Sequence, residues 1–296
     1  MTEVRVLSPA KINLFLEILG ERSDGYHEIR TLMQLVDLTD EILLRRVEAG
    51  IELRVAGLAA GVPEHEENLV WRAARLVLQE MGGGGGVSIS LYKRIPVGGG
   101  LGGGSSNAAA TLWGMKSLFG LPISMAELKN WAMLLGSDVP FFLTSGCALA
   151  EGRGEVLKEV RLPQRWAVII FPGFGISTKW AYDRKKIKLT KGGEKGKNMC
   201  FGVAPSGEGL SQPYINELEE VVREKYPLIG DLKAALLDSG AKMALMSGSG
   251  SSVYGIFDDR ERAKEAASHW RGQEGYLVHE GRTLDFNPIF GGECSY

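Results

Sequence analysis

This sequence of 296 residues has few cysteines and almost no net charge. Its three cysteines, Cys147, Cys200 and Cys294, lie far apart and belong to no Cys-x-x-Cys pair, which argues against a zinc site and predicts free thiols in a reducing compartment. The 34 basic and 36 acidic residues leave a net charge of −2, so the broad positive field that binds nucleic acid or anionic lipid is missing. An anionic ligand must be held by local geometry.

Long apolar runs are also absent. No stretch approaches the ~18 residues that a membrane span requires, and no targeting segment is visible, so we expect a cytoplasmic protein that binds neither membrane nor nucleic acid. With 44% hydrophobic residues, the chain is long enough to bury roughly 75% of its unfolded surface. The sequence does not indicate an oligomeric state.

Helical and strand patterns alternate along the chain, with a soft break near residue 160. We therefore predict an α+β protein with one domain over residues 1–160 and a second over 161–296. Residues 183–213, rich in lysine and glycine, are interpreted as an excursion or mobile loop without chemistry. Strands are predicted at 4–7, 12–18, 51–55, 87–91, 147–150, 168–171, 243–246, 253–257 and 276–279, and helices at 69–81, 128–135, 214–225, 228–237 and 263–270.

Glycine is abundant and clustered, with 40 residues that gather at 82–86, 98–104 and 248–255. The first cluster predicts a flexible connection. In the second, six of seven residues are glycine, and Ser105, Ser106 and Asn107 follow, which we expect to cap an alanine-rich helix. Backbone N–H groups without neighbouring β-carbons can converge on an anion, and the positive end of a helix adds to their field. The segment therefore predicts a phosphate cradle.

Two known phosphate motifs fit this loop poorly. The P-loop pattern fails, because no glycine is followed by lysine and then serine or threonine at the required spacing. Gly98, Gly100 and Gly103 satisfy the G-x-G-x-x-G pattern, but the early βαβ unit and the acidic residue of a dinucleotide site are not found. A purely structural glycine turn is the remaining alternative.

Three further segments place polar residues in apolar surroundings. Lys11 and Asn13 share one face of an apolar strand, so the amine either meets an anion or reaches solvent at the strand edge. Asp138 is the lone acid of residues 136–142, where it either acts chemically or caps a helix. Residues 246–253 predict a strand-turn-strand whose glycines permit close backbone approach.

Together these segments resemble the GHMP kinase superfamily, whose members share a Pro-Ala-Lys-x-Asn strand, a Pro-x-x-x-Gly-Leu-Gly phosphate loop and a C-terminal glycine-rich motif. The order and spacing match along nearly the whole chain, although residues 183–213 fit the pattern poorly. The segment Asp24-Gly25-Tyr26-His27 is similar to the branch that phosphorylates a cytidine diphosphate-linked methylerythritol. The resemblance implies a two-domain fold, with an N-terminal domain like the second domain of ribosomal protein S5, a ferredoxin-like C-terminal domain, and the active site between them.

The resemblance also implies the reaction and its residues. ATP, with Mg²⁺, would phosphorylate the 2-hydroxyl of that small-molecule substrate, in the non-mevalonate route to isoprenoid precursors. Lys11 and Asp138 match the catalytic residues, whereas the protein ligands of the metal are unknown. The residues assigned to ATP are Asn68, Lys93, Pro96, Gly98, Gly99, Gly100, Leu101, Gly102, Gly103, Gly104, Ser105, Ser106 and Asn107. Those assigned to the substrate are Asn13, Tyr26, His27, Asp138, Thr178 and Tyr182.

Several alternatives stay open at this point. Without the resemblance, Tyr26 and His27 fit an ordinary turn that leads into a strand, and Tyr182 fits core packing. A kinase for homoserine, mevalonate or a related alcohol would keep the chemistry, but residues 24–27 argue against it. A non-catalytic nucleotide-binding or RNA-associated module would keep the S5-like half, but the net charge and the presence of both Lys11 and Asp138 argue against it. We also expect Gly102→Val to weaken ATP binding while leaving the fold mostly intact.

Overall fold

Two long strands organise the first half of the chain. In this computed structural model, which describes residues 2–190, 214–291 and 293–295, β1 (Glu3–Glu21) and β2 (His27–Val47) pair antiparallel along nearly their whole length. The strands predicted separately at 4–7 and 12–18 are therefore one strand. Its register against β2 shifts between Pro9 and Ala10 and at two later points, and such bulges let a long strand bend. The sequence did not predict β2, because the charged side chains between Asp37 and Glu41 interrupt its apolar pattern.

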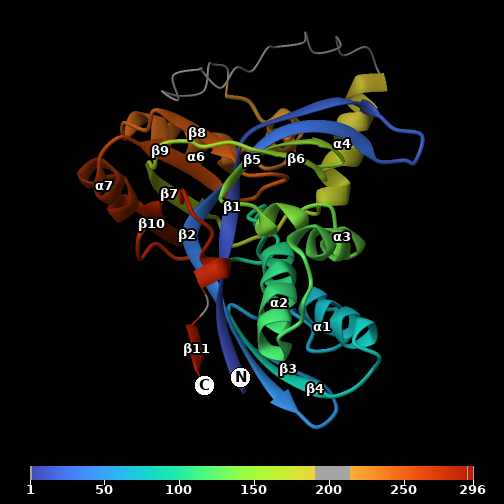
Figure 1. Ribbon diagram of the computed structural model, residues 1–296. Coiled ribbons are helices and arrows are strands. Elements are labelled where there is room, and N and C mark those ends of the chain that lie inside the picture. The colour runs from blue at the N-terminus through green and yellow to red at the C-terminus, as the bar shows by residue number, and fades with distance from the viewer. Residues whose placement is uncertain (1, 191–213, 292, 296) are drawn as a thin grey trace.

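The first sheet contains seven strands within the described residues. Its main path runs β11 (Glu293–Ser295), β1, β2, β4 (Gly86–Lys93) and β3 (Gly50–Gly57), while β5 (Cys147–Gly152) pairs with both β2 and β6 (Val156–Glu159). Helix α2 (Gly103–Phe119) packs on β1 and β2, and α1 (Leu69–Glu80) and α3 (Met125–Leu135) flank it (Figure 1). Their apolar side chains form the core of the first domain.

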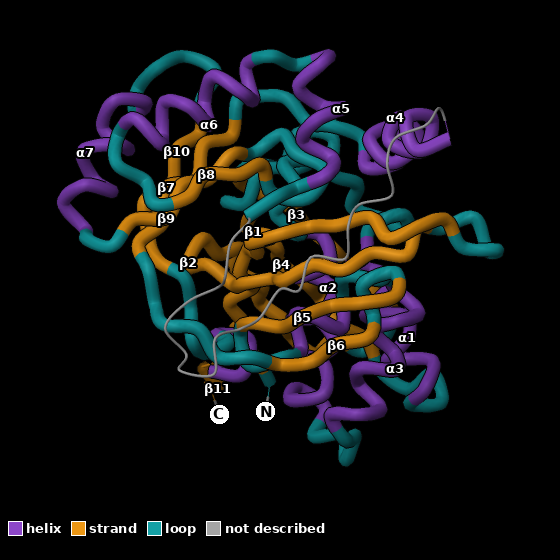
Figure 2. The backbone as a smooth tube through the Cα atoms, turned by 90° about the horizontal axis from the view of Figure 1, so that it is seen from above, coloured by secondary structure: helices purple, strands orange, loops and turns teal. Residues whose placement is uncertain are grey.

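The second sheet has the order β10 (Leu277–Arg282), β7 (Trp166–Phe171), β9 (Val253–Phe257) and β8 (Met243–Met246). Helices α6 (Leu228–Asp238) and α7 (Arg260–Trp270) pack against it, as the view from above shows (Figure 2). Helix α5 (Glu217–Lys225) contacts α6, and it also contacts α4 (Thr178–Thr190) and β1. Short 3-10 helices lie at Pro140–Leu143 and Pro288–Gly291. The mixed strands and helices confirm the α+β class.

The two sheets meet through a shared core. Apolar residues of β1, among them Ile12 and Leu14, pack with residues of β7, β8 and β9. The change from β6 to β7 falls between residues 159 and 166, near the predicted break at 160, but β11 returns to pair with β1. The domain limits of 1–160 and 161–296 stay a prediction.

The structure corrects two local expectations. Helix α2 begins at Gly103 after a left-handed N-cap at Gly102 that makes no side-chain hydrogen bond, so residues 105–107 lie inside the helix and do not cap it. Helix α4 runs to Thr190, so the first part of the predicted excursion at 183–213 is helical, and residues 191–213 lie outside the described residues. Asn68 does cap α1, because its Oδ1 accepts the Val70 N–H at 2.9 Å.

Within the described ranges, no helix is both long and apolar enough to cross a membrane. Cys147 is a free, buried thiol, and burial raises its pKa to about 12, so it is a poor nucleophile. The predictions for Cys200 and for the Cys294 side chain lie outside what the structure describes.

Candidate active site

A cavity of about 950 Å³ opens between the two halves of the protein. It is lined from the first half by β1, the turn before β2, the 98–104 loop and the turn at Asp138, and from the second half by the start of α4 and the 248–249 turn. Every predicted site residue lines it except Ser106. Segments more than two hundred residues apart in sequence therefore meet at one site.

Backbone geometry requires glycine at three positions of the 98–104 loop. Gly98, Gly100 and Gly102 adopt φ values of 72°, 74° and 70°, which side chains rarely tolerate. A β-carbon on Gly100 would also lie 2.0 Å from the Ser247 carbonyl oxygen. The loop thus presses against the 247–252 turn between β8 and β9, which is the strand-turn-strand predicted there.

Both halves of the protein hold this loop in place. From the second half, the Ser252 N–H donates to the Gly99 carbonyl at 3.1 Å and the Ile176 N–H donates to the Gly98 carbonyl at 3.2 Å. From the first half, the Lys11 N–H donates to the Leu101 carbonyl at 2.9 Å. Because the carbonyls are engaged inside the protein, the loop is fixed in one conformation.

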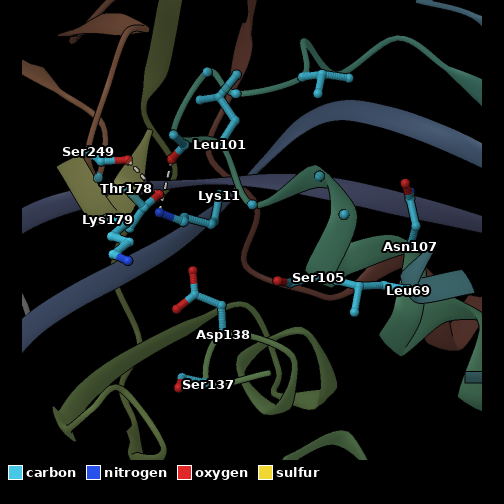
Figure 3. A pocket seen from close by; sticks show the side chains of 18 of the residues that line it. Lys11, Leu69, Leu101, Ser105, Asn107, Ser137, Asp138, Thr178, Lys179 and Ser249 are labelled. Carbon is cyan, nitrogen blue, oxygen red and sulfur yellow. Dashed lines mark hydrogen bonds between the residues drawn. The ribbon is translucent and has the colours of Figure 1, made fainter. Parts of the chain in front are cut away.

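The loop leads directly into α2, whose N-terminus lies at the cavity. Its first turn contains no acidic residue, so its free N–H groups carry uncompensated positive partial charge. Gly104 has open space at its β-carbon position, with only Leu69 within 4 Å, and Ser105 lines the cavity beside it (Figure 3). An anion of the size of a phosphate fits the chemistry of this corner.

Lys11 is buried at the end of this loop. Only 4% of the side chain is exposed, and its Nζ donates to Asn13 Oδ1 at 2.5 Å and to the Gly100 carbonyl at 3.0 Å, so the interpretation that it reaches solvent is wrong. Burial lowers the pKa of the ammonium from the ordinary lysine value, and the Asp138 carboxylate raises it. The amine therefore stands close to a negative charge and away from water.

A short chain of hydrogen bonds orients the Lys11 amine. The Thr31 hydroxyl donates to the Phe15 carbonyl at 2.5 Å, so its oxygen accepts from Asn13 Nδ2 at 2.8 Å. This fixes the amide of Asn13 with its Oδ1 toward Lys11. Asn13 and Thr31 are both buried.

Asp138 lies in the turn between α3 and the 3-10 helix that starts at Pro140. Its side chain points toward Lys11 across the cavity (Figure 3). The N-cap of the 3-10 helix is Val139 and uses no side-chain hydrogen bond, so the capping interpretation of Asp138 is wrong. Among the described residues, no side chain donates a hydrogen bond to this carboxylate, which leaves its oxygens open to the cavity.

Aromatic residues also line the cavity. The rings of His27 and Tyr182 lie 5.1 Å apart with an interplanar angle of 38°. Tyr26 is 55% exposed, and the Arg153 guanidinium lies 4.8 Å from its ring centroid. Burial first, and then Asp138, raises the pKa of the Tyr182 hydroxyl, so this ring stays neutral. An exposed face of this kind suits a planar base.

Some predicted residues lie deeper than expected. Ser106 is fully buried, and its hydroxyl accepts from Ser8 Oγ at 2.7 Å behind the loop. Lys93 is 4% exposed and forms a short ion pair with Asp40. Thr178, in contrast, is exposed at the cavity and lies 3.0 Å from the Ser249 hydroxyl (Figure 3).

Sequence reasoning missed several residues of this site. Arg153 follows β5 in a turn with no distinctive pattern, and Lys179 adjoins Thr178 in the first turn of α4, yet both line the cavity. Asp40 lies within β2, a strand that was not predicted, and does not itself line the cavity; the signal that could have found it is an acid within an apolar run.

The site contains little that would bind a metal by itself. In the described part of the chain, no group of three or more His, Cys, Asp or Glu side chains is placed to hold a metal ion. Glu67, Asp138 and Asp183 are the carboxylates among the described residues that line the cavity, and the Ser105 hydroxyl adds a neutral oxygen. This donor set fits Mg²⁺, which binds through one or two carboxylates together with substrate phosphates and water.

Comparison with known proteins agrees with this geometry. The profile of the GHMP kinases N terminal domain matches residues 68–146, and that of the GHMP kinases C terminal matches residues 204–276. The fold and the site thus define the class as the two-domain GHMP kinases. A homoserine kinase from Cytophaga hutchinsonii, 22% identical with a TM-score of 0.69, covers 99% of this chain and 97% of its own and shares the fold.

Nearer relatives narrow the class. A 4-diphosphocytidyl-2-C-methyl-D-erythritol kinase of Geobacter sp. (strain M21) is 41% identical over 96% of this chain and 100% of its own. That of Syntrophus aciditrophicus (strain SB) is 44% identical over 89% and 93%. A crystal structure of 4-(cytidine 5'-diphospho)-2C-methyl-D-erythritol kinase is 34% identical, with a TM-score of 0.80, over 94% and 98%. The chain belongs to the 4-diphosphocytidyl-2-C-methyl-D-erythritol kinase family of GHMP kinases.

Proposed function

We propose that this protein is an enzyme that transfers the γ-phosphoryl group of ATP to the 2-hydroxyl of 4-diphosphocytidyl-2-C-methyl-D-erythritol, a step of the non-mevalonate route to isoprenoid precursors. One observation carries the proposal: a buried amine, Lys11, and an open carboxylate, Asp138, face each other between a glycine cradle and an aromatic pocket. Relatives that are about 40% identical over nearly the whole chain bear the name of this kinase.

The nucleotide occupies the end of the cavity beside the 98–104 loop. The N–H groups of this loop and of the first turn of α2 bind the phosphates, and Ser105 and Asn107 line the same corner. Asn68 and Lys93 lie on the adenosine side. Ser106 supports the loop from behind, because its N–H donates to the Gly102 carbonyl at 2.9 Å and its hydroxyl bonds inside the protein.

The cytidine end of the substrate occupies the aromatic end of the cavity. The exposed ring of Tyr26 stacks on the base, a contact worth ~1 to 3 kcal/mol in other base-binding proteins. His27 reads the edge of the base, and Tyr182 closes the pocket from α4. Thr178 and Asn13 lie between this end and the amine, along the path of the diphosphate and the methylerythritol.

The two catalytic groups act by position and charge. Phosphoryl transfer through a loose transition state requires the hydroxyl proton to leave late, so a carboxylate of ordinary basicity suffices when it is well placed. Asp138 accepts this proton, and the Lys11 ammonium stabilises the negative charge that develops on the attacking oxygen. Asp138 or Glu67 would hold Mg²⁺ together with the phosphates and water, and the bound metal would supply charge neutralisation.

A kinase for another small alcohol is the nearest alternative. Homoserine and mevalonate kinases have the same fold, at 22% and 13% identity, so the fold does not separate them from this chain. The pair of rings at His27 and Tyr182, with Tyr26 beside them, supports a substrate that carries a base. The net charge of −2 supports the absence of a nucleic-acid partner. We place the enzyme in the cytoplasm, where ATP is available.

The test is a coupled ADP-release assay with purified protein. We expect turnover with the cytidyl diphosphate substrate and none with mevalonate or homoserine. Asp138→Asn keeps the shape of the side chain and removes the base, so kcat is expected to fall about 10²- to 10⁴-fold. Turnover with mevalonate but not with the cytidyl substrate would overturn the acceptor, and full activity of Asp138→Asn would remove this residue from the mechanism.

A further inference from the structure

A buried acid behind the glycine loop has no part in the mechanism above. Asp40 lies within β2 and is fully buried. Its Oδ1 accepts the N–H groups of Arg94 at 2.6 Å and Ile95 at 2.8 Å. Its Oδ2 accepts from Asn107 Nδ2 at 2.9 Å and, through a short ion pair, from Lys93 Nζ. One carboxylate thus joins the end of β4 to the start of α2.

The two members of the Asp40–Lys93 ion pair lie in different surroundings. Lys93 and Asn107 line the cavity, whereas Asp40 does not. A β-carbon on Gly103 would lie 3.1 Å from Lys93 Nζ, so the ammonium rests against the first residue of α2. The positive end therefore faces the phosphate corner, and the negative end faces the core.

Stability does not explain this arrangement. A buried ion pair loses hydration that its attraction recovers only in part, and apolar replacements of such pairs are often neutral or stabilising. An ammonium beside a helix N-terminus is also opposed by the positive end of the helix. An anion in the cavity next to Gly103 would offset both the lost hydration of the ammonium and its repulsion by the helix N-terminus.

Asn107 is held by the same acid. Its Nδ2 donates to both Asp40 and Ser8 Oγ, and its Oδ1 accepts from Lys93 Nζ at 2.9 Å. Because both the oxygen and the nitrogen of the amide are hydrogen-bonded, the position of Asn107 relative to Lys93 is fixed. Loss of the Asp40 charge would disturb both cavity residues at once.

We propose that Asp40 is a positioning residue for the nucleotide, which holds Lys93 and Asn107 so that the ammonium faces bound ATP. The inference rests on the proposed function, since it requires ATP at the glycine loop. Burial lowers the pKa of Lys93 and Asp40 raises it, so removal of the carboxylate also favours loss of the positive charge.

The test is Asp40→Asn, which keeps an oxygen for the N–H groups of Arg94 and Ile95 but removes the charge and replaces the acceptor Oδ2 by an NH2 group that faces Lys93 and Asn107. Calorimetric titration with ATP and Mg²⁺ is expected to give about tenfold weaker binding, the scale of one charged hydrogen bond. The KM for ATP should rise by a similar factor, while kcat and the KM for the cytidyl substrate change less than about twofold.

A matched control separates positioning from general destabilisation. Glu219 is another buried acid that accepts from a lysine, Lys233 at 2.6 Å, and from a backbone N–H, that of Met246 at 3.1 Å, but it does not line the cavity. Glu219→Gln is expected to lower the melting temperature without a selective change in the KM for ATP. The inference would be overturned if Asp40→Asn raised the KM for ATP and the KM for the cytidyl substrate by the same factor, and if Glu219→Gln raised both KM values in the same way.

The double variant Asp40→Asn/Lys93→Met removes the buried charge altogether, which keeps the question testable if the single variant does not fold. We expect a melting temperature near that of the wild type and ATP binding still about tenfold weaker. Wild-type ATP affinity in either variant overturns this inference alone. A wild-type protein that does not bind ATP overturns the proposed function, and the inference with it.

Discussion

At the residue scale, Lys11 combines burial with a nearby negative charge. Burial dominates and lowers the pKa of its ammonium, which the Asp138 carboxylate raises in part. A lysine in this position titrates below its ordinary value of 10.5. Loss of the proton at high pH therefore removes the cation that catalysis requires, and it also removes the unfavourable buried charge.

We expect kcat to fall at alkaline pH with an apparent pKa below 10.5, as Lys11 loses its proton. Between the folded and unfolded pKa values the unfolded chain binds more protons, so the contribution of Lys11 to the free energy of unfolding increases with pH over the same window. A fall in kcat without loss of stability thus distinguishes this titration from alkaline unfolding. Rate and melting curves between pH 7 and 10 test it.

Lys11→Arg is the control, because a guanidinium stays charged over this range. The variant is expected to be slower than the wild type, since the planar group does not reproduce the contacts of Nζ with Asn13 and Gly100. Its kcat should also show no decrease at alkaline pH with an apparent pKa below 10.5. If the variant keeps the limb of the wild type, another group titrates.

Thr31 offers a second test at this scale. Thr31→Val keeps the shape of the side chain but removes the hydroxyl that fixes the Asn13 amide, so the Lys11 amine loses its oriented partner. We expect kcat to fall by about tenfold, the effect of one hydrogen bond, with little change in the KM for ATP. Steady-state kinetics measure this, and a change in the KM for ATP alone would contradict it.

At the scale of elements, the glycine loop was predictable from the sequence, but the tolerance of each glycine to substitution was not. Six glycines before an alanine-rich helix are enough to predict an anion cradle. The expectation that Gly102→Val leaves the fold mostly intact does not hold. Gly102 has a φ of 70°, and a β-carbon there would lie 2.8 Å from the Phe142 ring.

Gly104→Ala is the better probe of the cradle. Gly104 has helical conformation and open space, and alanine stabilises a helix interior by up to about 1 kcal/mol relative to glycine. The added methyl group enters the cavity beside the phosphates. We therefore expect an unchanged or higher melting temperature together with a higher KM for ATP, measured by thermal unfolding and steady-state kinetics. An unchanged KM would argue that ATP does not approach Gly104.

Local patterns predicted most elements, and contacts distant in sequence determined the rest. The helix after Asn68 and the strands around residues 89, 169 and 255 follow from capping and apolar periodicity. The strand β2 was missed because Asp40 lies in its middle, where its charge is compensated by Lys93, 53 residues later in the chain. In the same way, Arg153 meets Tyr26 only through tertiary structure.

At the scale of the whole molecule, the site exists only where the two halves meet. Tyr254 of β9 is fully buried and donates its hydroxyl to the Asn13 carbonyl at 2.7 Å, so the second sheet is bonded to the strand that carries Lys11. Tyr214 and residues of β7 and β8 share the same core. The two halves are therefore expected to unfold together.

A denaturant titration tests this coupling. We expect the loss of activity and the change in tryptophan fluorescence to follow one transition, and ATP at 100 times its Kd to raise the free energy of unfolding by about 2.7 kcal/mol. Activity that disappears at clearly lower denaturant than the fluorescence signal would mean that the halves separate first.

The double anchoring of the glycine loop has a consequence for chimaeric enzymes. Its carbonyls at Gly98 and Gly99 are bound by the C-terminal half, and that at Leu101 by the N-terminal half. A C-terminal half exchanged with that of a different kinase would have to bring donors that match Ile176 and Ser252, or the hybrid would lose nucleotide recognition although Tyr26, His27 and the loop itself came from the parent.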